Sequence, residues 1–436
     1  MNHAAIWHKA WPIILANAAV PLLGIADTAV IGNVGNLAQL GAIAFGAMIF
    51  SFIYWSFGFL RMGTTGFTAQ ANGAGDEPEV RATLGRALLV GALLGIAIVL
   101  LQWPLSQLAL TLLNGSAEVE AITADYFRIR IWGAPATLSI FALTGCLIGL
   151  GRSRHLLLVQ VFLNGLNILL DVLFAGVFGW GAEGIALGTV LAEWLTVILA
   201  TGLVVKLLRE RRADSEPFWP RHRIVDTDKM LRLMAANTDI LLRTLLLLFS
   251  FAWFINQSAQ FGDAVLGANH ILLQLVSFSA FFLDGYAFVA EALVGEALGA
   301  KRRQDLALAV RRSSELAAAT AVLLALLIAC FGDLAIAALT DLAAVRDAAA
   351  GTLGWAALYV LLSFAAFQLD GIFIGATRTR EMRNASFVSL IVFMLAWWWL
   401  TPRYGSHGLW AAFVILVCAR AIALAGYYPR LLRGAQ

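Results

Sequence analysis

The sequence has little charge. Asp, Glu, Lys and Arg make up 13% of its 436 residues, whereas 61% of the residues are hydrophobic. A soluble globular protein contains about 25% charged and about 45–50% apolar residues. The shortage of charge therefore excludes an ordinary soluble enzyme. The net charge of +3 also leaves no basic excess for binding a nucleic acid.

Cysteine is scarce too, and the motifs of common enzymes are missing. Cys146, Cys330 and Cys418 stand singly in apolar runs, without the paired spacing of metal or redox sites. The sequence has no zinc-protease HExxH, nucleophile-elbow GxSxG or P-loop GxxxxGK[ST] pattern. These absences argue against catalysis by such motifs and against energy from ATP bound to this chain.

Long apolar runs, by contrast, are abundant. Gly, Pro and charged clusters divide them into twelve segments of about 20 residues or more, which is the length that crosses a bilayer. The segments are 11–33, 40–70, 84–106, 121–149, 155–178, 182–206, 233–260, 265–298, 307–331, 345–375, 384–402 and 406–428. We therefore predict an all-α polytopic membrane protein with twelve transmembrane helices.

The positions of the basic residues predict the orientation. With the N-terminus inside, most Lys and Arg fall in cytoplasmic segments, and the opposite loops hold Arg128, Arg130, Arg346 and Arg403. Because basic residues resist translocation, both termini are expected to be cytoplasmic. The first span is too long for a cleavable signal and is expected to stay in the protein.

An internal repeat divides the chain into two similar halves. GCLIGLGRSR at 145–154 aligns without a gap on GIFIGATRTR at 371–380, an offset of 226. An offset that contains six spans returns the chain to the same side, so the halves have parallel topology, as in many transporters. We predict two pseudo-symmetric six-helix lobes, joined by a solvated cytoplasmic connector. Their boundaries are 1–207, 208–230 and 231–436.

A few acids lie inside predicted spans, where a charge costs about 2.5–3.5 kcal/mol. The clearest are Asp27 and Asp171. Asn167 is four residues before Asp171 and shares its helical face, as Thr189 does with Glu193. Such carboxylate, amide and hydroxyl oxygens could hold a proton or coordinate a hard cation such as Na⁺. The offset of 226 places Trp253 and Trp397 at the positions of the two Asp residues, which favours a specialised acidic site in the first half.

The second half carries other charges within its spans. Asp239 and Arg243 are four residues apart, so a neutralising helix pair is expected. Asp284 and Asp370 each occur in an LDG string, and we expect helix-end or inter-helix pairing for them.

The first span contains two prolines, Pro12 and Pro21. Proline lacks a backbone donor and its ring clashes with the preceding turn, so a kink is expected in this helix. A kinked helix that carries an acid could couple its shape to protonation, although a static kink is an equally good interpretation.

The strings ADTAVIGNVG around Asp27, LNGLNILLDVLF around Asp171 and GAEGIALGTVLAEW around Thr189 resemble the multidrug and toxic compound extrusion (MATE) family. Together with LDGYAFVAEALVGEALGA at 283–300, they look like its DNA-damage-inducible F (DinF) branch. The resemblance covers nearly the whole chain.

This resemblance implies a transporter rather than an enzyme, with a V-shaped pair of lobes that exports amphipathic, often cationic compounds in exchange for H⁺ or Na⁺. It implies that Asp27, Asn167, Asp171 and Thr189 form the polar cluster of the first lobe, and that Pro12 matches the family's kink proline. Asp370 is the candidate counterpart of the acids that bind a cation in the second lobe of the sodium-coupled branch. No cofactor beyond the coupling ion is implied.

Several alternatives remain at this point. Proton-driven efflux is favoured by the one-sided acidic pair, but the same four residues could furnish an oxygen shell for Na⁺. A lipid-linked precursor flippase would need more basic residues along its path, and a membrane enzyme would need a nucleophile or metal cluster. We expect a monomer, multi-pass in a bacterial cytoplasmic (inner) membrane, whose partners are the lipid bilayer and small substrates and not a nucleic acid.

Overall fold

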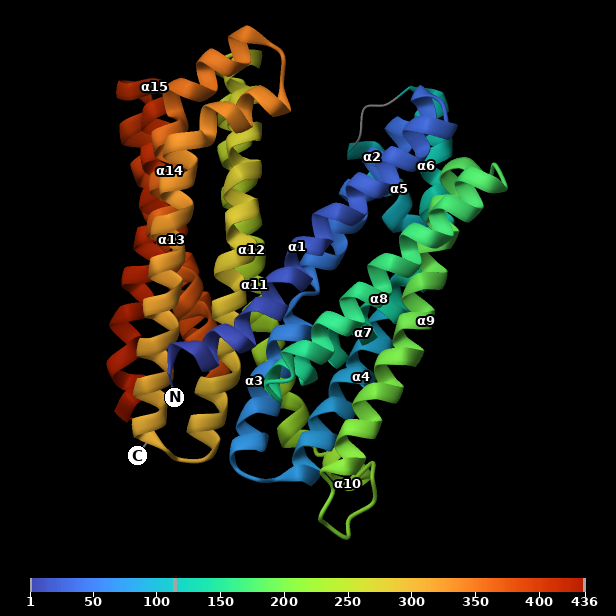
Figure 1. Ribbon diagram of the computed structural model, residues 1–436, viewed down its shortest axis with the longest axis vertical. Helices are drawn as coiled ribbons and strands as arrows, with labels where there is room; N and C mark the ends of the chain where they lie inside the picture. The colour runs from blue at the N-terminus through green and yellow to red at the C-terminus, as the bar shows by residue number, and fades with distance from the viewer. Residues whose placement is uncertain (1, 113–115, 434–436) are drawn as a thin grey trace. The chain divides into compact units, whose positions relative to one another are not determined.

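The computed structural model describes residues 2–112 and 116–433, and every element in those ranges is a helix (Figure 1). The first half contains α1 (His3–Val34), α2 (Leu37–Ser56), α3 (Phe59–Gly73), α4 (Glu77–Leu100), α5 (Gln102–Leu112), α6 (Ala117–Arg130), η1 (Ile131–Gly133), α7 (Ala134–Gly149), α8 (Ser153–Asp171), η2 (Val172–Val177) and α9 (Gly181–Glu210). The second half follows α10 (Arg221–Ile224) and contains α11 (Thr227–Ala259), α12 (Asp263–Gly299), α13 (Arg303–Leu339), α14 (Ala343–Gly375) and α15 (Thr379–Arg433).

The helices account for all twelve predicted spans. Ten segments of the described chain are long and apolar enough to cross a membrane. One of them, α15, joins the predicted spans 384–402 and 406–428 at Gly405, where φ is 57° and ψ is −133°. The first predicted span lies in α1, which is a single helix of 32 residues through both Pro12 and Pro21. The side chains of residues 21–25, which include Pro21, lie outside the described part of the chain.

The internal repeat is visible in the helix boundaries. The helix α2 begins at Leu37 and α12 at Asp263, while α7 ends at Gly149 and α14 at Gly375. Both pairs differ by 226, the offset of the repeated strings. The all-α, duplicated architecture predicted from the sequence is therefore confirmed.

The repeat also preserves unusual backbone positions. Gly75 and Gly151 have φ angles of 71° and 65°, and their equivalents Lys301 and Thr377 have φ angles of 54° and 53°. A left-handed residue after a helix satisfies its last carbonyls and is usually glycine. The second half thus keeps the turn geometry although a side chain now occupies each position.

Close helix packing explains why the repeated strings contain glycine. A Cβ added at Gly145 of α7 would lie 2.5 Å from the carbonyl oxygen of Arg61 in α3. A Cβ at Gly371 of α14 would overlap the carbonyl oxygen of Ala287 in α12. The two contacted residues, Arg61 and Ala287, are themselves related by the offset of 226. Small residues at such crossings let two helix backbones approach closely in a membrane.

The first half is more broken than the second. A turn at Phe57 and Gly58 separates α2 from α3, and the 3₁₀ helix η1 separates α6 from α7. The equivalent helices α12 and α14 are continuous. The sequence predicted single spans 40–70 and 121–149, because hydropathy measures length and does not detect a local change of helix type.

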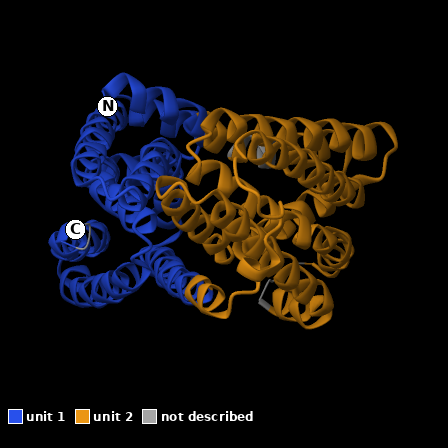
Figure 2. Ribbon diagram, turned by 90° about the horizontal axis from the view of Figure 1, so that it is seen from below, with its two compact units in different colours: residues 1–14, 234–436 blue, residues 15–233 orange. Residues whose placement is uncertain are grey.

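Contacts divide the chain into two compact units (Figure 2). One unit consists of residues 1–14 and 234–436, and the other of residues 15–233. The start of α1 therefore belongs with the second half, where the rings of Trp7 and Tyr286 lie 6.5 Å apart. The boundary within α1 falls two residues after Pro12.

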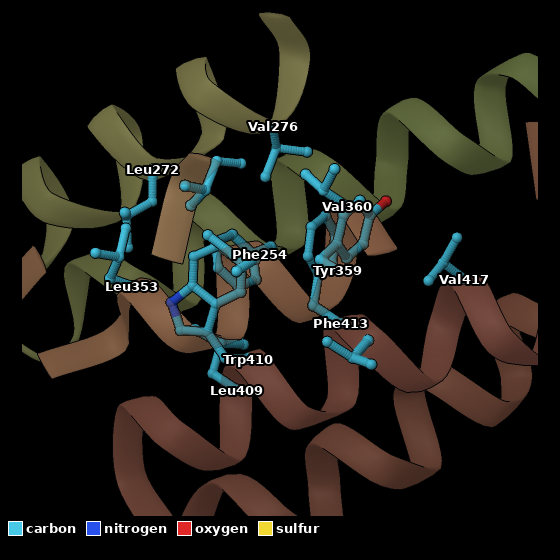
Figure 3. Close-up of a cluster of buried hydrophobic side chains, with 14 of the residues drawn as sticks. Phe254, Leu272, Val276, Leu353, Tyr359, Val360, Leu409, Trp410, Phe413 and Val417 are labelled. Atoms are coloured by element: carbon cyan, nitrogen blue, oxygen red, sulfur yellow. The ribbon is translucent and has the colours of Figure 1, made fainter. Parts of the chain in front are cut away.

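Aromatic side chains fill the core of the unit that holds the second half (Figure 3). Phe413 of α15 lies at its centre, with its ring 4.8 Å from that of Tyr359 and 4.4 Å from that of Phe254. Trp410 packs edge-on against Phe254 and donates its indole N–H to Asn269 at 2.9 Å. The indole N–H within this apolar core is thus satisfied, as is usual for a buried indole.

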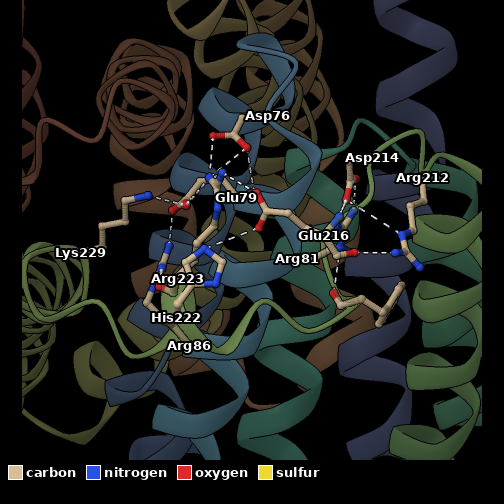
Figure 4. Close-up of polar contacts among 11 residues, drawn as sticks. Asp76, Glu79, Arg81, Arg86, Arg212, Asp214, Glu216, His222, Arg223 and Lys229 are labelled. Carbon is tan, nitrogen blue, oxygen red and sulfur yellow. Dashed lines mark hydrogen bonds and ion pairs between the residues drawn. The ribbon is translucent and has the colours of Figure 1, made fainter.

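The connector at 208–230 is docked on its own unit through charged side chains, while many of its residues remain exposed to solvent (Figure 4). The guanidinium of Arg81, near the start of α4, is fully buried and donates to both carboxylate oxygens of Asp214 at 2.9 and 2.7 Å. Its Nε donates to the carbonyl of Phe218 at 2.8 Å. Arg86 donates to the carbonyl of Arg223 at 2.6 Å.

Charge complementarity continues along the connector. Arg223 binds Asp76 at 3.1 Å and Glu216 at 2.8 Å, and Lys229 binds Glu79 at 2.6 Å. Asp76 and Glu79 lie far from the connector in sequence, so charge spacing within the connector gave no sign of these two partners. Three basic residues of the connector, Arg211, Arg223 and Lys229, are thus paired with acids at the start of α4.

Acid should release this docking. The Arg81 guanidinium holds the pKa of the Asp214 carboxyl below its usual range. A depressed folded-state pKa stabilises the docked connector above the ordinary Asp pKa of about 3.9, and this contribution is lost as the pH falls through the folded value. Hydrogen exchange of residues 211–224, corrected for intrinsic rates, should therefore accelerate by about tenfold or more below pH 4, as expected for loss of a charge-assisted hydrogen bond.

The Asp214→Asn variant should show the faster exchange already at pH 7 and a smaller change with acid. Glu210→Gln, an exposed acid at the end of α9, is the matched control. Equal exchange of the wild type and Asp214→Asn at pH 7 would contradict this assignment.

Candidate functional site

Two acids of the unit at 15–233 occupy neighbouring helices. Asp27 lies in α1 and is partly buried, while Asp171 is the last residue of α8 and has no exposed surface. The π-helical turn η2 follows Asp171 directly. Such turns are rare and are frequent at functional sites. The two carboxyl groups are close enough to interact electrostatically.

The other two predicted residues join this site through α8 and α9. The amide nitrogen of Asn167 donates to the hydroxyl of Thr189 at 2.9 Å, and that hydroxyl donates to the carbonyl of Ile185 at 2.9 Å. A Cβ added at Gly188 would lie 2.5 Å from Oδ1 of Asp171. A glycine at this place therefore lets the carboxylate lie against the backbone of α9.

Several oxygens of this group have no hydrogen-bond donor among the described residues. They are Oδ1 of Asp27, both carboxylate oxygens of Asp171 and Oδ1 of Asn167, and all are buried. Buried carboxylate oxygens without a partner are costly, so native proteins supply a proton, a cation or a ligand for them. The arrangement is an acceptor-only site that can take up a proton or another positive group.

Glu193 lies one helical turn beyond Thr189 on α9, but it is already neutralised. Its two carboxylate oxygens accept from the guanidinium of Arg130 at 2.8 and 2.7 Å, and the residues are 5% and 8% exposed. The expectation that Arg130 lies in an outer loop is wrong. Arg130 ends α6 inside the segment Ala117–Gly149, which is long and apolar enough to cross a membrane, and its position within the predicted span 121–149 was the available signal.

Aromatic residues at this site were missed by the sequence analysis. Tyr126 is buried, and its hydroxyl lies within electrostatic range of Asp27, Asp171, Arg130 and Glu193. It stands four residues before Arg130 on α6 and so faces the same way. Tyrosine is common in apolar helices, so its spacing alone could not identify it.

The equivalent positions in the second half contain aromatic rings. Trp253 and Trp397, which replace Asp27 and Asp171 at an offset of 226, pack edge to face with ring centroids 5.0 Å apart. Phe393 replaces Asn167 and is fully buried. The acceptor-only site is therefore built once in the duplicated chain.

The charged residues of the second half are paired differently from the sequence prediction. Asp239 binds Arg383 at 2.7 Å and the hydroxyl of Thr379 at 3.1 Å. Arg243 pairs instead with Asp370. The prediction of an Asp239–Arg243 helix pair is wrong, because partners on α14 and α15 are better placed than a neighbour on the same helix.

Asp370 has a second cationic partner. The guanidinium of Arg420 lies 3.5 Å from the Asp370 carboxylate that also binds Arg243. Two guanidinium groups beside one carboxylate disfavour a further cation there. Asp284, the other acid of the repeated LDG string, lies partly buried on α12. The described residues contain no group of three or more His, Cys, Asp or Glu that could hold a metal ion.

Comparison with known proteins agrees with this architecture. The MatE family model matches residues 12–173 and again residues 240–399, once in each half of the chain. The chain belongs to the MatE family. The resemblance to the multidrug and toxic compound extrusion (MATE) family is thereby confirmed, and membership makes the chain a membrane transporter rather than an enzyme.

Individual relatives cover the MatE chain from end to end. DNA damage-inducible protein F of Escherichia coli (strain K12) is 36% identical over 426 residues, which span 98% of this chain and 92% of the relative. A probable multidrug resistance protein NorM of Deinococcus radiodurans is 26% identical and covers 97% of this chain and 94% of its own. The DinF branch predicted from the sequence is thus supported.

Solved structures show the same MatE fold. An outward-facing multidrug resistance MATE family transporter superposes with a TM-score of 0.88 at 17% identity, covering 100% of this chain and 97% of its own. The Vibrio cholerae MATE transporter VcmN in its bent form superposes with a TM-score of 0.88 at 19% identity, covering 99% of this chain and 97% of the VcmN chain. At this level of identity the likeness concerns the fold, with its twelve transmembrane helices.

Proposed function

We propose that this chain exports small amphipathic, often cationic compounds from the cytoplasm in exchange for protons by alternating access. The observation that carries the proposal is the acid pair Asp27 and Asp171, whose buried oxygens lack donors. Two carboxylates side by side and away from water repel each other, so a proton stabilises the pair. A cationic substrate favours the ionised form and competes with that proton.

This competition is sufficient to couple the two movements. If a proton weakens substrate binding, the substrate weakens proton binding by the same factor. A proton taken up from the outer side would release the substrate there, and loss of the proton inside would restore the site. The chain would act as a monomer in the bacterial inner membrane, with both termini in the cytoplasm.

Sodium coupling is the second candidate. The unpartnered Oδ1 of Asn167 lies in the same site as the carboxylates of Asp27 and Asp171, and oxygen ligands of this kind suit a hard cation. A lipid-linked precursor flippase has less support. Arg130 is the guanidinium that acts electrostatically on both acids, and Glu193 already occupies it.

Transport against separately imposed gradients tests the proposal. Purified protein in liposomes should move a fluorescent lipophilic cation such as ethidium when only a pH gradient is present. It should not do so when only a sodium gradient is present at equal pH. Transport driven by sodium alone would favour the second candidate, and no vectorial movement under either gradient would contradict both.

A further inference from the structure

The ion pair of Arg130 and Glu193 lies beside the acid pair but takes no part in the proposed exchange. The guanidinium uses both terminal nitrogens on Glu193 and lies over the rings of Phe50 and Tyr54, 5.1 and 5.4 Å from their centroids. A Cβ at Gly133 would overlap the Glu193 carboxylate. Arg130 is therefore held on several sides, with Glu193 as its acidic partner.

Residue spacing on two helices, α9 and α6, connects this ion pair to the proposed site. On α9, Thr189 and Glu193 lie four residues apart on one face, and Thr189 accepts from Asn167. On α6, Tyr126 and Arg130 are also four residues apart. Thr189 and Glu193 are therefore about 6 Å apart along the axis of α9, slightly more than one helical turn.

The titratable and charged groups around the acid pair come from five helices. They are Asp27 on α1, Tyr54 on α2, Tyr126 and Arg130 on α6, Asp171 on α8, and Glu193 on α9. Arg130 is the cation of this group. It acts on both Asp27 and Asp171, yet its hydrogen bonds go to Glu193 and Tyr54.

We propose that Glu193 is a positioning residue that keeps the Arg130 guanidinium from binding Asp27 and Asp171 directly. From this position the guanidinium weakens the hold of the two acids on a proton. This role rests on the proposed use of the acid pair as the coupling site. A guanidinium bound directly to the pair would neutralise it and leave no place for a proton or substrate. Without the guanidinium, the proton would be held too firmly to be released.

Carbodiimide labelling measures protonation of the pair without requiring transport. N,N′-dicyclohexylcarbodiimide reacts with protonated carboxyl groups in apolar surroundings, and mass spectrometry of the peptides containing Asp27 and Asp171 gives the labelling rate against pH. Arg130→Gln should move the labelling midpoint to higher pH by about one unit or more, since a nearby buried charge is worth that much. Glu193→Gln should move it to lower pH by a similar amount, because the freed guanidinium turns to the acids.

The double variant Arg130→Gln/Glu193→Gln distinguishes positioning from direct participation. It should move the midpoint to higher pH by as much as Arg130→Gln alone, because a residue that acts through Arg130 has no further effect once Arg130 is removed. Arg128→Gln, an exposed arginine two residues away on α6, should leave the midpoint unchanged. If Glu193→Gln does not fold, Arg130→Gln and the double variant still provide the comparison.

Three results would overturn the role of Glu193. They are an unchanged midpoint in Arg130→Gln, a shift of Glu193→Gln to higher pH, and a double variant whose midpoint returns to that of the wild type. A wild type that moves no cation in liposomes but shows these midpoint shifts would contradict the proposed function while leaving the ion pair's effect on the acids intact.

Discussion

Replacing Asp27 with Asn should abolish export driven by a pH gradient while leaving the protein folded. The amide cannot take up a proton at any working pH, so substrate and proton no longer compete for one site. We expect the initial rate of ethidium export from pH-gradient proteoliposomes to fall by about 100-fold, at the upper end of the range for coupling between two ligands. Asp171→Asn should fall by a similar factor, because the two acids share the proton.

The control for this result is Asp333→Asn, which makes the same chemical change at an exposed position of α13. It should retain the wild-type rate. All three variants should elute as monodisperse protein with similar unfolding temperatures, since Asn is nearly the same size as Asp. Full proton-driven export by Asp27→Asn would refute the assignment of this residue as the coupling site.

Replacing Gly371 with Leu should prevent accumulation of folded protein. A Cβ at this position overlaps the backbone carbonyl oxygen of Ala287, and a backbone cannot rotate away as a side chain can. The two helices involved, α12 and α14, pack along much of their length in the second half. Overpacking a rigid contact of this kind costs about 3 kcal/mol or more, a large fraction of a protein's total stability.

The matched control is Gly354→Leu on the same helix, where nothing lies within 4 Å of an added Cβ. Its unfolding temperature should stay within a few degrees of the wild type. Gly145→Leu tests the equivalent crossing in the first half, where the nearest atom is the carbonyl oxygen of Arg61. Normal yield and stability of Gly371→Leu would show that α12 and α14 can separate without loss of the fold.

The sequence predicts the helices well because the signal is local. Apolar length marks each span, and the glycine-containing strings at 145–154 and 371–380 reveal the duplication. The break at Phe57 was not predicted, since it interrupts hydrogen bonding without interrupting hydropathy. Docking of the connector was not predicted either, because Arg81 and Asp214 are 133 residues apart and only the fold brings them together.

At the candidate site, too, local spacing could be predicted from the sequence and contacts between distant residues could not. The spacing of Asn167 and Asp171 predicted a shared face of α8, and the structure adds the contact with Thr189. The partner of Glu193 could not be found by spacing, because Arg130 comes from another helix 63 residues away. Asp239 and Arg243 show the opposite error: a favourable local spacing was outweighed by partners on other helices.

The tryptophan pair of the second half limits how many protons can be carried in each transport cycle, and so how much energy each cycle can use. Trp253 and Trp397 occupy the places of Asp27 and Asp171, and an indole carries no group that ionises near neutral pH. The duplicated chain therefore has two sets of helices but one pair of acids equivalent to Asp27 and Asp171. Under proton coupling, the site at Asp27 and Asp171 can load at most two protons per cycle, which fixes the maximum stoichiometry and hence the steepest substrate gradient that this pair of acids can sustain.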